Sequence, residues 1–384
     1  MARSRRTLRG EVSTWGDIRR VTLVTPYALS VFGGVQEQVL SMSRELSRRD
    51  VEVQVIAPYD RDEANYDTPA QLVRLGRLLS IPANGSRAPL TLSRRASREA
   101  YARVITFRPD VVHFHEPFAP RIGWRTLRAH RTASVATFHR SGQGPAVSLA
   151  APLLRRWSEH LDVSAAVSEQ AAMTAERSCD VTATVLFNGF ETERFVEFAR
   201  ERQAVTTIVV VGRLEARKGV ATAITAVRSH NEHSDEPWRL VVVGNGPQRA
   251  NLLAQAGSDD AVQFLGSVSD VEKRRWYRRA DVLVAPAIHG ESFGLILLEA
   301  MASETRVVAS DIPGYREAAG AHAVLFDAGE SADLERALEG ALASRDIATL
   351  ARARAYAEHW SMRRLVDDYL GLYQEARQRF AALR

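Results

Sequence analysis

The chain has 384 residues, of which 45% are hydrophobic and 25% charged, a balance typical of a globular protein with room for two domains. Its single cysteine, Cys179, excludes an intrachain disulfide and indicates a reducing compartment. The net charge of +5 suits phosphate-bearing partners or an anionic membrane surface, although a basic proteome would produce the same excess. The sequence contains no apolar run of membrane-spanning length and no nucleic-acid-binding motif.

The start of the chain predicts a tail followed by a βαβ unit. Residues 1–19 are basic and lack the apolar segment of a signal peptide, so we expect a disordered tail. A strand is predicted at residues 21–25, then a glycine-containing loop, an amphipathic helix and a second strand at residues 51–55. A parallel sheet is the default for this order. Gly33 and Gly34 let the backbone approach a ligand closely, or they form only a turn.

An arginine-rich stretch spans residues 81–103, with a helix predicted to begin near Leu92. The arginines of this stretch are Arg87, Arg94, Arg95, Arg98 and Arg103. Arg94, Arg95 and Arg98 share a helix face because they are three or four residues apart. A basic amphipathic helix can lie on an anionic membrane, where each arginine contributes about 1 kcal/mol. The alternative is an ordinary solvated helix face.

Two further strands carry histidines. His113 and His115 alternate onto one face of a strand predicted at residues 110–115. A metal site there is disfavoured, because no cysteine and no carboxylate follows at a known ligand spacing. The strand predicted at residues 134–138 ends in His139. Since parallel sheets bind ligands at the carboxyl ends of their strands, His139 is a candidate functional residue.

The second half of the chain begins with a charged linker and a strand at residues 208–211. The loop G-R-L-E-A-R-K-G follows, and its Arg213 and Lys218 can bind a diphosphate and stabilise it as a leaving group, although such cations are also common on surfaces. A later G-N-G-P run lacks the third glycine of a dinucleotide fingerprint, because Arg249 occupies that position. A nicotinamide cofactor is therefore not expected.

The stretch from Ala285 to Ala302 combines a strand end, a loop and an apolar helix. Ser292 and Gly294 lie where the helix should begin, and a helix start offers free N–H groups to a phosphate. The carboxylate of Glu291 can accept hydrogen bonds from sugar hydroxyls, and that of Glu299 can hold ribose hydroxyls. This combination suits a nucleotide sugar. The alternative is an amphipathic helix with two solvated glutamates.

The spacing Glu-x7-Glu, with S-F-G after Glu291 and E-A-M-A at Glu299, resembles the signature of the family-4 retaining glycosyltransferases. The runs P-Y, F-G-G-V-Q, N-G-S, H-F-H-E-P and T-F-H are similar to those of the actinobacterial phosphatidyl-myo-inositol mannosyltransferases. The resemblance implies the GT-B fold, an α/β architecture of two doubly wound Rossmann-like domains facing a central cleft. Residues 20–200 are the expected acceptor domain, joined by a C-terminal helix at 361–384, and residues 201–360 are the expected nucleotide-sugar domain.

The resemblance also assigns roles to individual residues. The implied catalytic residues are His139, Arg213, Lys218 and Glu291. The implied donor-binding residues are Gly33, Gly34, Arg213, Lys218, Gly266, Asp270, Glu291, Ser292, Phe293, Gly294 and Glu299. The implied acceptor-binding residues are Tyr27, Gln36, Asn84, Ser86 and Arg140, and the implied membrane-binding residues are Arg87, Arg94, Arg95 and Arg98. Arg140 departs from the family, which usually has a small hydroxyl residue there, so the acceptor is less well defined.

The expected activity is retaining transfer of a hexose, with mannose from GDP-mannose as the first candidate, onto a membrane lipid such as phosphatidylinositol. The family's route is front-face attack guided by the leaving phosphate, with no metal or other cofactor required. We expect a monomer in the cytoplasm, peripheral on the inner face of the plasma membrane. Two alternatives stay open: a glycosyltransferase of the same fold that uses a UDP-sugar and a soluble acceptor, and a catalytically silent sugar-nucleotide binding protein.

Overall fold

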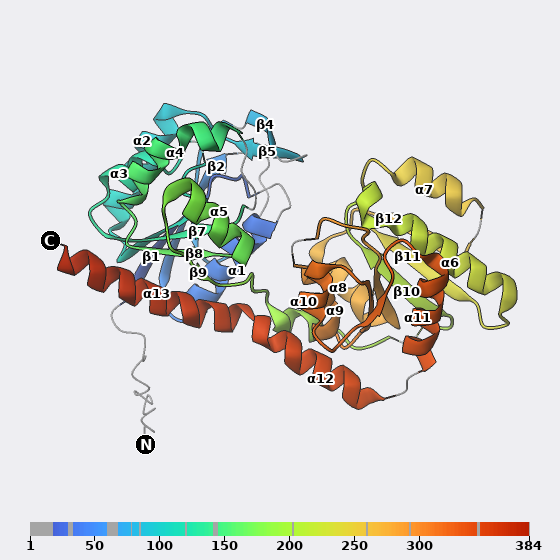
Figure 1. Ribbon diagram of the computed structural model, residues 1–384. Coiled ribbons are helices and arrows are strands. Elements are labelled where there is room, and N and C mark those ends of the chain that lie inside the picture. The colour runs from blue at the N-terminus through green and yellow to red at the C-terminus, as the bar shows by residue number, and fades with distance from the viewer. Residues whose placement is uncertain are drawn as a thin grey trace, which may run out of the picture. The chain divides into compact units, whose positions relative to one another are not determined.

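The computed structural model describes residues 18–29, 34–59, 68–77, 79–83, 86–119, 121–140, 145–201, 203–258, 260–291, 293–343 and 346–383. The chain divides into two compact units (Figure 1). The first contains the residues up to Gly189 and those from Met362 onward, and the second is Phe190–Ser361. The chain passes from the first unit to the second at Phe190, before the expected boundary at residue 200. Phe190 and Phe195 already pack in the core of the second unit.

The first unit is built on a sheet of seven parallel strands. In sheet order these strands are β3 (Gln71–Arg77), β2 (Glu52–Tyr59), β1 (Arg20–Val24), β6 (Val111–His115), β7 (Ala133–Phe138), β8 (Val163–Ala166) and β9 (Thr184–Val185). A separate antiparallel hairpin is formed by β4 (Leu79–Ala83) and β5 (Ser86–Leu90). The helices of this unit are α1 (Gly34–Arg48), α2 (Arg94–Phe107), α3 (Trp124–Ala129), α4 (Pro145–Ser158), α5 (Glu169–Cys179) and α13 (Met362–Ala382).

Helices cover both faces of this sheet, and neighbouring residues of a strand face opposite layers (Figure 1). Val111 of β6 packs with α1 and α13, whereas Val112 packs with α2 and α3. Strands buried on both faces read as continuous apolar runs, which explains the Val-rich sequence. The C-terminal helix α13 places Tyr369 and Tyr373 against the sheet, fully buried.

The second unit contains a sheet of six parallel strands. In sheet order these are β12 (Val262–Gly266), β11 (Trp238–Val243), β10 (Thr206–Val211), β13 (Val282–Ala285), β14 (Arg306–Ser310) and β15 (Val324–Phe326). Its α-helices are α6 (Val220–His233), α7 (Arg249–Ala256), α8 (Asp270–Arg279), α9 (Leu295–Ala302), α10 (Pro313–Ala319), α11 (Ser331–Ala343) and α12 (Ile347–Ala357). Three 3₁₀ turns complete the unit: η1 (Thr192–Val196), η2 (Ala216–Lys218) and η3 (Glu358–Trp360).

Both sheets reverse their strand order at one place. In the first unit β1 lies between β2 and β6, and in the second β10 lies between β11 and β13. In the first sheet, the loops after β1 and β6 therefore leave in opposite directions, which makes a switch point. The loops after β10 and β13 do the same in the second sheet. Parallel α/β sheets bind ligands in the crevice at this point. The two doubly wound sheets confirm the predicted α/β class and position the candidate residues of each unit.

The helix predicted to begin near Leu92 is α2, which begins at Arg94 because the side chain of Ser93 accepts a hydrogen bond from the backbone N–H of Ala96. Arg87 precedes this helix and lies in β5, a strand that was not predicted. The prediction of a linker after Val196 was wrong, because Glu197 is ion-paired with Arg274 of α8 at 2.6 Å. Within the described residues, no helix combines the length and the apolar composition needed to cross a bilayer.

Candidate functional site

At the switch point of the first sheet, four polar side chains follow three strands. Tyr27 follows β1, Glu116 follows β6, and His139 and Arg140 follow β7. One carboxylate oxygen of Glu116 accepts the backbone N–H groups of His139 and Arg140 at 2.6 and 2.7 Å. Glu116 adopts a φ of 52°, which is strained for a residue with a side chain. Buried and strained, Glu116 anchors the loop that presents His139.

His139 is also held by a second histidine from the neighbouring strand. Nδ1 of His115 lies 3.0 Å from Nε2 of His139, and the ring of His115 stacks on that of His113 at 4.3 Å. Burial lowers the pKa of His139 to about 3, and burial together with the other two histidines holds the pKa of His115 well below its ordinary value. The rings are therefore neutral near pH 7, and His139 can act as a hydrogen-bonding group rather than as a cation.

Beneath these rings lies a chain of buried hydrogen bonds. Tyr369 and Thr137 share a hydrogen bond of 2.7 Å, and Thr137 lies 2.7 Å from Nε2 of His113. Nδ1 of His113 lies 2.9 Å from the hydroxyl of Tyr373, which in turn donates to the sulfur of Met42 at 3.8 Å. Both ring nitrogens of His113 therefore have a hydrogen-bond partner, Thr137 on one side and Tyr373 on the other. Burial lowers the pKa of His113 to about 3, consistent with a neutral ring.

The predicted acceptor residues divide into three groups. Tyr27 is half-buried near Glu116 and Arg140, and burial raises its pKa, with a further increase from Glu116. Gln36 is buried and donates to the carbonyl of Ala28 at 3.3 Å, so its amide N–H supports the loop after β1. Asn84 lies outside the described residues, as does the side chain of Ser86. The predicted donor residues Gly33 and Ser292 and the side chain of the predicted membrane residue Arg87 also lie outside them, whereas Gly34 begins α1.

At the switch point of the second sheet, charged side chains of alternating sign form one chain of contacts. Glu291 accepts from Lys218 at 2.6 Å and from Arg217 at 2.7 Å. Arg217 also pairs with Glu215 at 2.9 Å, and Glu215 pairs with Arg213 at 3.1 Å. Sequence reasoning found Arg213, Lys218 and Glu291 but missed Glu215 and Arg217, because nothing in their spacing distinguishes them from surface charges.

Two glycines fix the loops that carry these charges. Gly219 has a φ of 63°, and a Cβ there would lie 1.9 Å from the carbonyl oxygen of Pro286. The loop after β10 therefore packs against the loop after β13 at a spacing that excludes any side chain. Gly294 has a φ of 87° and caps α9, where a Cβ would lie 2.6 Å from the ring of Tyr315. Gly294 therefore lets α9 begin in close contact with Tyr315, and a helix N-terminus offers free N–H groups to an anion.

Glu299 lies in the second turn of α9 and is almost fully buried. Its two carboxylate oxygens accept from Lys273 at 2.9 Å and from the hydroxyl of Tyr277 at 2.8 Å. Burial alone would lower the pKa of Lys273, but Glu299 and Asp270 raise it above its ordinary value. A carboxylate has about four acceptor positions, so two partners leave Glu299 able to accept ribose hydroxyls.

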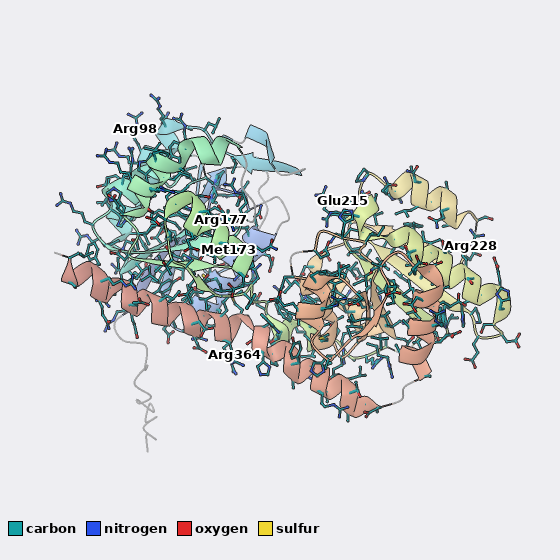
Figure 2. The ribbon with its side chains drawn as sticks, viewed as in Figure 1. Arg98, Met173, Arg177, Glu215, Arg228 and Arg364 are labelled. Carbon is teal, nitrogen blue, oxygen red and sulfur yellow. The ribbon has the colours of Figure 1, made fainter. Side chains whose placement is uncertain are left out.

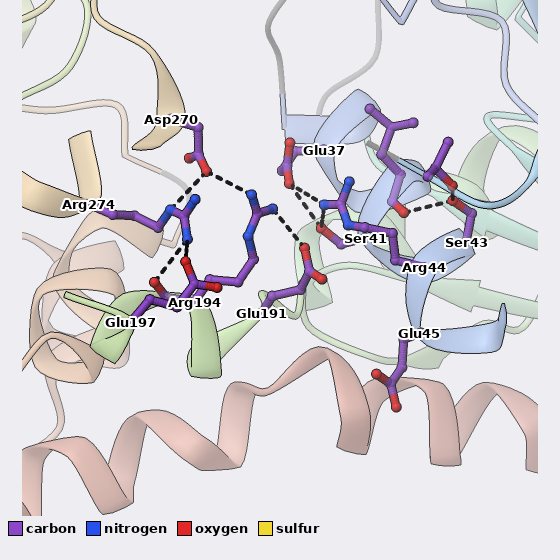
Figure 3. Close-up of polar contacts among 12 residues, drawn as sticks. Glu37, Ser41, Ser43, Arg44, Glu45, Glu191, Arg194, Glu197, Asp270 and Arg274 are labelled. Atoms are coloured by element: carbon purple, nitrogen blue, oxygen red, sulfur yellow. Dashed lines mark hydrogen bonds and ion pairs between the residues drawn. The ribbon is translucent and has the colours of Figure 1, made fainter. Parts of the chain in front are cut away.

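Asp270, predicted to bind the donor, lies in a structural ion network (Figure 3). Its carboxylate contacts Arg274 at 3.1 Å, Lys273 at 3.3 Å and Arg194 at 3.5 Å. Burial opposes ionisation, but these cations hold the pKa of Asp270 below its ordinary value. Arg194 also pairs with Glu191 at 3.1 Å, so the network fastens η1 to α8.

Two other predicted donor residues contribute through the backbone or packing. Gly266 ends β12 with a φ of 71°, and its carbonyl accepts the N–H of Gly244 at 2.8 Å. The ring of Phe293 packs edge-on against Trp360 at 4.7 Å between centroids, which fixes the residue before the α9 cap. The structure places both residues on the loops that surround the charged chain.

The predicted membrane-binding arginines lie in a larger basic surface. Arg94 and Arg98 of α2 line a pocket of about 550 Å³, and Arg98 points away from the body of the unit (Figure 2). The other lining residues are Ser97, Arg121, Trp124, Arg125 and Arg128. Within the described part of the chain none of the five arginines is ion-paired, and Arg95, on the same helix, is exposed and likewise without an ion pair. Sequence reasoning missed the arginines on and beside α3, because W-R-T-L-R-A carries no amphipathic signal of useful length.

A cavity of about 970 Å³ lies at the other edge of the second sheet, where Thr206, Trp238 and Arg306 begin strands. It is therefore remote from Arg213 and Lys218 within this unit. Among the described residues, one group of side chains has the spacing of metal ligands, namely His230, Glu335 and Glu339. Nδ1 of His230 lies 3.5 Å from Glu339, and both residues line the cavity at the opposite edge of the sheet, so this group is not part of the candidate site.

Comparison with known proteins identifies the family. Residues 190–360 match the family described as "Glycosyl transferases group 1", and residues 32–194 match "Glycosyltransferase Family 4". The phosphatidyl-myo-inositol mannosyltransferase of Mycobacterium leprae is 35% identical over 327 residues, which cover 83% of this chain and 86% of that protein. The protein of the same name from Propionibacterium freudenreichii is 30% identical over 382 residues, covering 95% and 97%.

A glycosyltransferase from Rickettsia africae has the same fold, with a TM-score of 0.71 at 15% identity over 94% of this chain and 99% of that one. The fold is GT-B, as the sequence predicted. The two family matches cover both units in succession, and the curated relatives span almost the whole chain. The chain is therefore a glycosyltransferase, and it belongs to the family of the phosphatidyl-myo-inositol mannosyltransferases.

Proposed function

We propose that this chain transfers mannose, with retention of configuration, from GDP-mannose to a phosphatidylinositol acceptor. The observation that carries the proposal is the charged chain at the second switch point, in which Glu291 lies between Lys218 and Arg217 beside the N-terminus of α9. This set suits a sugar diphosphate. The choice of mannose and of the lipid is supported by the names of the relatives that are 30–35% identical.

On the donor side, the leaving diphosphate gathers negative charge as the glycosidic bond breaks. Lys218 has three N–H donors and uses one on Glu291, so it can hold a phosphate oxygen at the same time. Arg213 is 65% exposed and pairs only loosely with Glu215, so it can turn toward the phosphate at little cost. Donors aimed at developing charge typically supply the largest single part of catalysis. These cations meet the charge of the diphosphate, so the proposal requires no metal ion.

On the acceptor side, the neutral ring of His139 is proposed to hold a hydroxyl of the transferred sugar. The carboxylate beside it, Glu116, uses one oxygen to accept two backbone N–H groups at 2.6 and 2.7 Å. A carboxylate bound in this way is poorly placed for nucleophilic attack, which favours front-face attack over a covalent sugar–enzyme intermediate. The acceptor hydroxyl then attacks the anomeric carbon on the face that the diphosphate leaves, and the leaving phosphate takes its proton.

The lipid acceptor is supported by the basic surface of α2 and α3. Five arginines line one pocket, and none of them has an ion-pair partner within the described residues. Such a surface is attracted to anionic lipids, with about 1 kcal/mol gained for each arginine near the membrane. We therefore propose a peripheral location on the inner face of the plasma membrane, where a cytoplasmic nucleotide sugar and a membrane lipid can meet.

The test begins with calorimetric titration of the full chain with GDP-mannose, UDP-glucose, UDP-N-acetylglucosamine and ADP-glucose. Binding of GDP-mannose alone supports the proposal, and preference for a UDP-sugar overturns the donor assignment. Vesicles with and without phosphatidylinositol then receive labelled GDP-mannose, and the anomeric configuration of the product lipid is read by NMR. Transfer to a soluble acceptor only would favour the first alternative function. Donor binding without hydrolysis or transfer would favour a silent binding protein.

A further inference from the structure

The contact between His115 and His139 requires one shared proton. Their facing nitrogens, Nδ1 of His115 and Nε2 of His139, lie 3.0 Å apart, which is a hydrogen-bond distance. One nitrogen must carry the proton and the other must accept it, because two lone pairs or two N–H groups would repel each other. Two arrangements are therefore open, and they leave His139 in opposite tautomers.

The surroundings of His115 distinguish the two arrangements. Nε2 of His115 is fully buried and has no hydrogen-bond partner among the described residues. A proton on this nitrogen would bury an unpaired N–H group, whereas a bare nitrogen there leaves only an unused acceptor, which is the smaller cost. The proton of His115 therefore belongs on Nδ1, where it is donated to Nε2 of His139.

We propose that His115 is a positioning residue that holds His139 in its Nδ1–H tautomer, so that His139 presents a hydrogen-bond donor to a hydroxyl of the transferred sugar. That the bound hydroxyl belongs to a transferred sugar rests on the proposed function, whereas the tautomer of His139 does not. Nε2 of His139 is occupied by His115, and Nδ1 has no partner among the described residues. A neutral imidazole that donates at Nδ1 selects a sugar oxygen with a free lone pair.

Three further contacts prevent the pair from rearranging. The ring of His115 is stacked between His113, at 4.3 Å between centroids, and His139, at 5.3 Å. The main chain of His139 is fixed by the carboxylate of Glu116 at 2.6 Å. His113 cannot supply or take a proton, because both of its ring nitrogens are bonded to Thr137 and Tyr373. Burial keeps all three rings neutral, since it lowers their pKa values.

The first test reads the tautomers directly in the full chain. Long-range ¹H–¹⁵N correlation NMR of histidine-labelled protein near neutral pH separates protonated from unprotonated ring nitrogens, and a His139→Gln variant assigns the His139 signals. The expected result is a protonated Nδ1 and an unprotonated Nε2 on His139, with a protonated Nδ1 on His115. The opposite pattern on either ring would overturn the proposal. This readout needs no substrate, so it stands whether or not mannose transfer is the activity.

The second test replaces His115, the residue that donates a hydrogen bond to His139. His115→Phe keeps a ring but removes the N–H, whereas His115→Asn keeps an amide N–H near the position of Nδ1. His115→Phe should give averaged tautomer signals for His139 and lower kcat by about tenfold to a hundredfold, with the KM for the donor nearly unchanged. His115→Asn should restore the single tautomer of His139 and the kcat of the wild type. A His115→Phe protein with the original tautomer and rate would contradict the proposal, and if that variant fails to fold, the wild-type spectrum and His115→Asn decide it.

A matched control removes a neighbouring buried histidine. His113→Phe keeps a ring beside His115 but removes the ring nitrogens of His113, which do not take part in the shared proton. We expect it to lower stability while leaving the Nδ1–H tautomer of His139 in place. If His113→Phe and His115→Phe disturb the tautomer of His139 equally, the effect is general loosening of the core and the specific role of His115 is refuted.

Discussion

At the carboxyl edge of the first sheet the histidines are neutral, and His113 and His115 are fully buried, whereas at the same edge of the second sheet the candidate residues are charged. His139 and His115 share one hydrogen bond in a dry layer above Tyr373. Arg213 and Lys218 instead form ion pairs with glutamates, and Arg213 is 65% exposed. Exposed ion pairs are weak and exchange partners readily, so Arg213 can turn toward a diphosphate, whereas Lys218 and Glu291 are mostly buried. A buried neutral network must be in place beforehand.

The largest expected effect is a loss of kcat when a cation is removed from the second site. Lys218→Ala should lower kcat for glycosyl transfer by about a thousandfold, because it deletes a donor aimed at the leaving diphosphate. Steady-state kinetics with the donor identified by titration measures the loss. Arg336→Ala, which removes an exposed cation from α11 in the same unit, is the control and should be silent. A loss below about tenfold for Lys218→Ala would show that the charged site is not catalytic.

The second effect concerns charge in the first unit, away from its neutral site. Replacing Arg94, Arg98 and Arg125 with Gln should weaken binding to phosphatidylinositol vesicles by about a hundredfold, because each arginine contributes about 1 kcal/mol at the membrane. Vesicle co-sedimentation at low and high salt measures the change. A triple variant in the second unit, of the half-buried Arg239 and the exposed Arg336 and Arg352, alters the net charge equally and should bind as the wild type does. Equal loss in both triples would show that total charge, and not this surface, attracts the membrane.

The third effect tests how much the neutral site depends on complete hydrogen bonding. Tyr373→Phe leaves Nδ1 of His113 buried without its hydrogen-bond partner, which should cost about 2 kcal/mol of stability. Hydrogen exchange of the amides in β6 and β7, followed by mass spectrometry, reports this loss for the first unit alone. Tyr356→Phe, which removes a long hydrogen bond of 3.4 Å on the second unit, should change little. Unchanged exchange in Tyr373→Phe would show that this buried bond does not stabilise the first unit.

The smallest effect is a dependence of stability on pH. The pKa of His113 falls from 6.5 to about 3 on folding, so folding favours the neutral ring. Its contribution is complete above pH 6.5 and is lost as the pH falls from there toward about 3. One unit below pH 6.5 the loss should be about 1 kcal/mol. Comparison of unfolding in wild type and His113→Phe isolates this residue, because both proteins keep His115, His139 and Glu116. Equal slopes would contradict the lowered pKa.

The sequence predicted the architecture because Val-rich strands and turn residues recur in a βαβ order, and because His139, Arg213, Lys218 and Glu291 lie in the loops that follow strands. It could not predict which side chains meet across strands. The bond between Glu116 and the amide of His139 depends on the register of β6 and β7, which no local pattern encodes. The hairpin of β4 and β5 was missed because its short strands lie beside a stretch rich in arginine, which favoured a helix.

Functional and structural charges were equally hard to separate. Asp270 follows a strand and a glycine, as a ligand-binding residue would, yet its carboxylate fastens Arg274 and Arg194 (Figure 3). The network that uses it includes Glu197, in the segment interpreted as a linker. The sequence shows where a carboxylate lies along the chain, but it does not show which cation forms an ion pair with it.

The C-terminal helix α13 has a consequence for how the protein is made. The core of the first unit includes Met362, Leu365, Tyr369 and Tyr373, whereas the second unit is one continuous segment, Phe190–Ser361. On the ribosome, the second unit can complete its core as soon as residue 361 has emerged. The first unit, although synthesised earlier, must wait with part of its sheet uncovered until the last helix arrives. Folding of the nascent chain is thus completed in the reverse of the order in which the two sheets are translated, and the buried histidines are covered last.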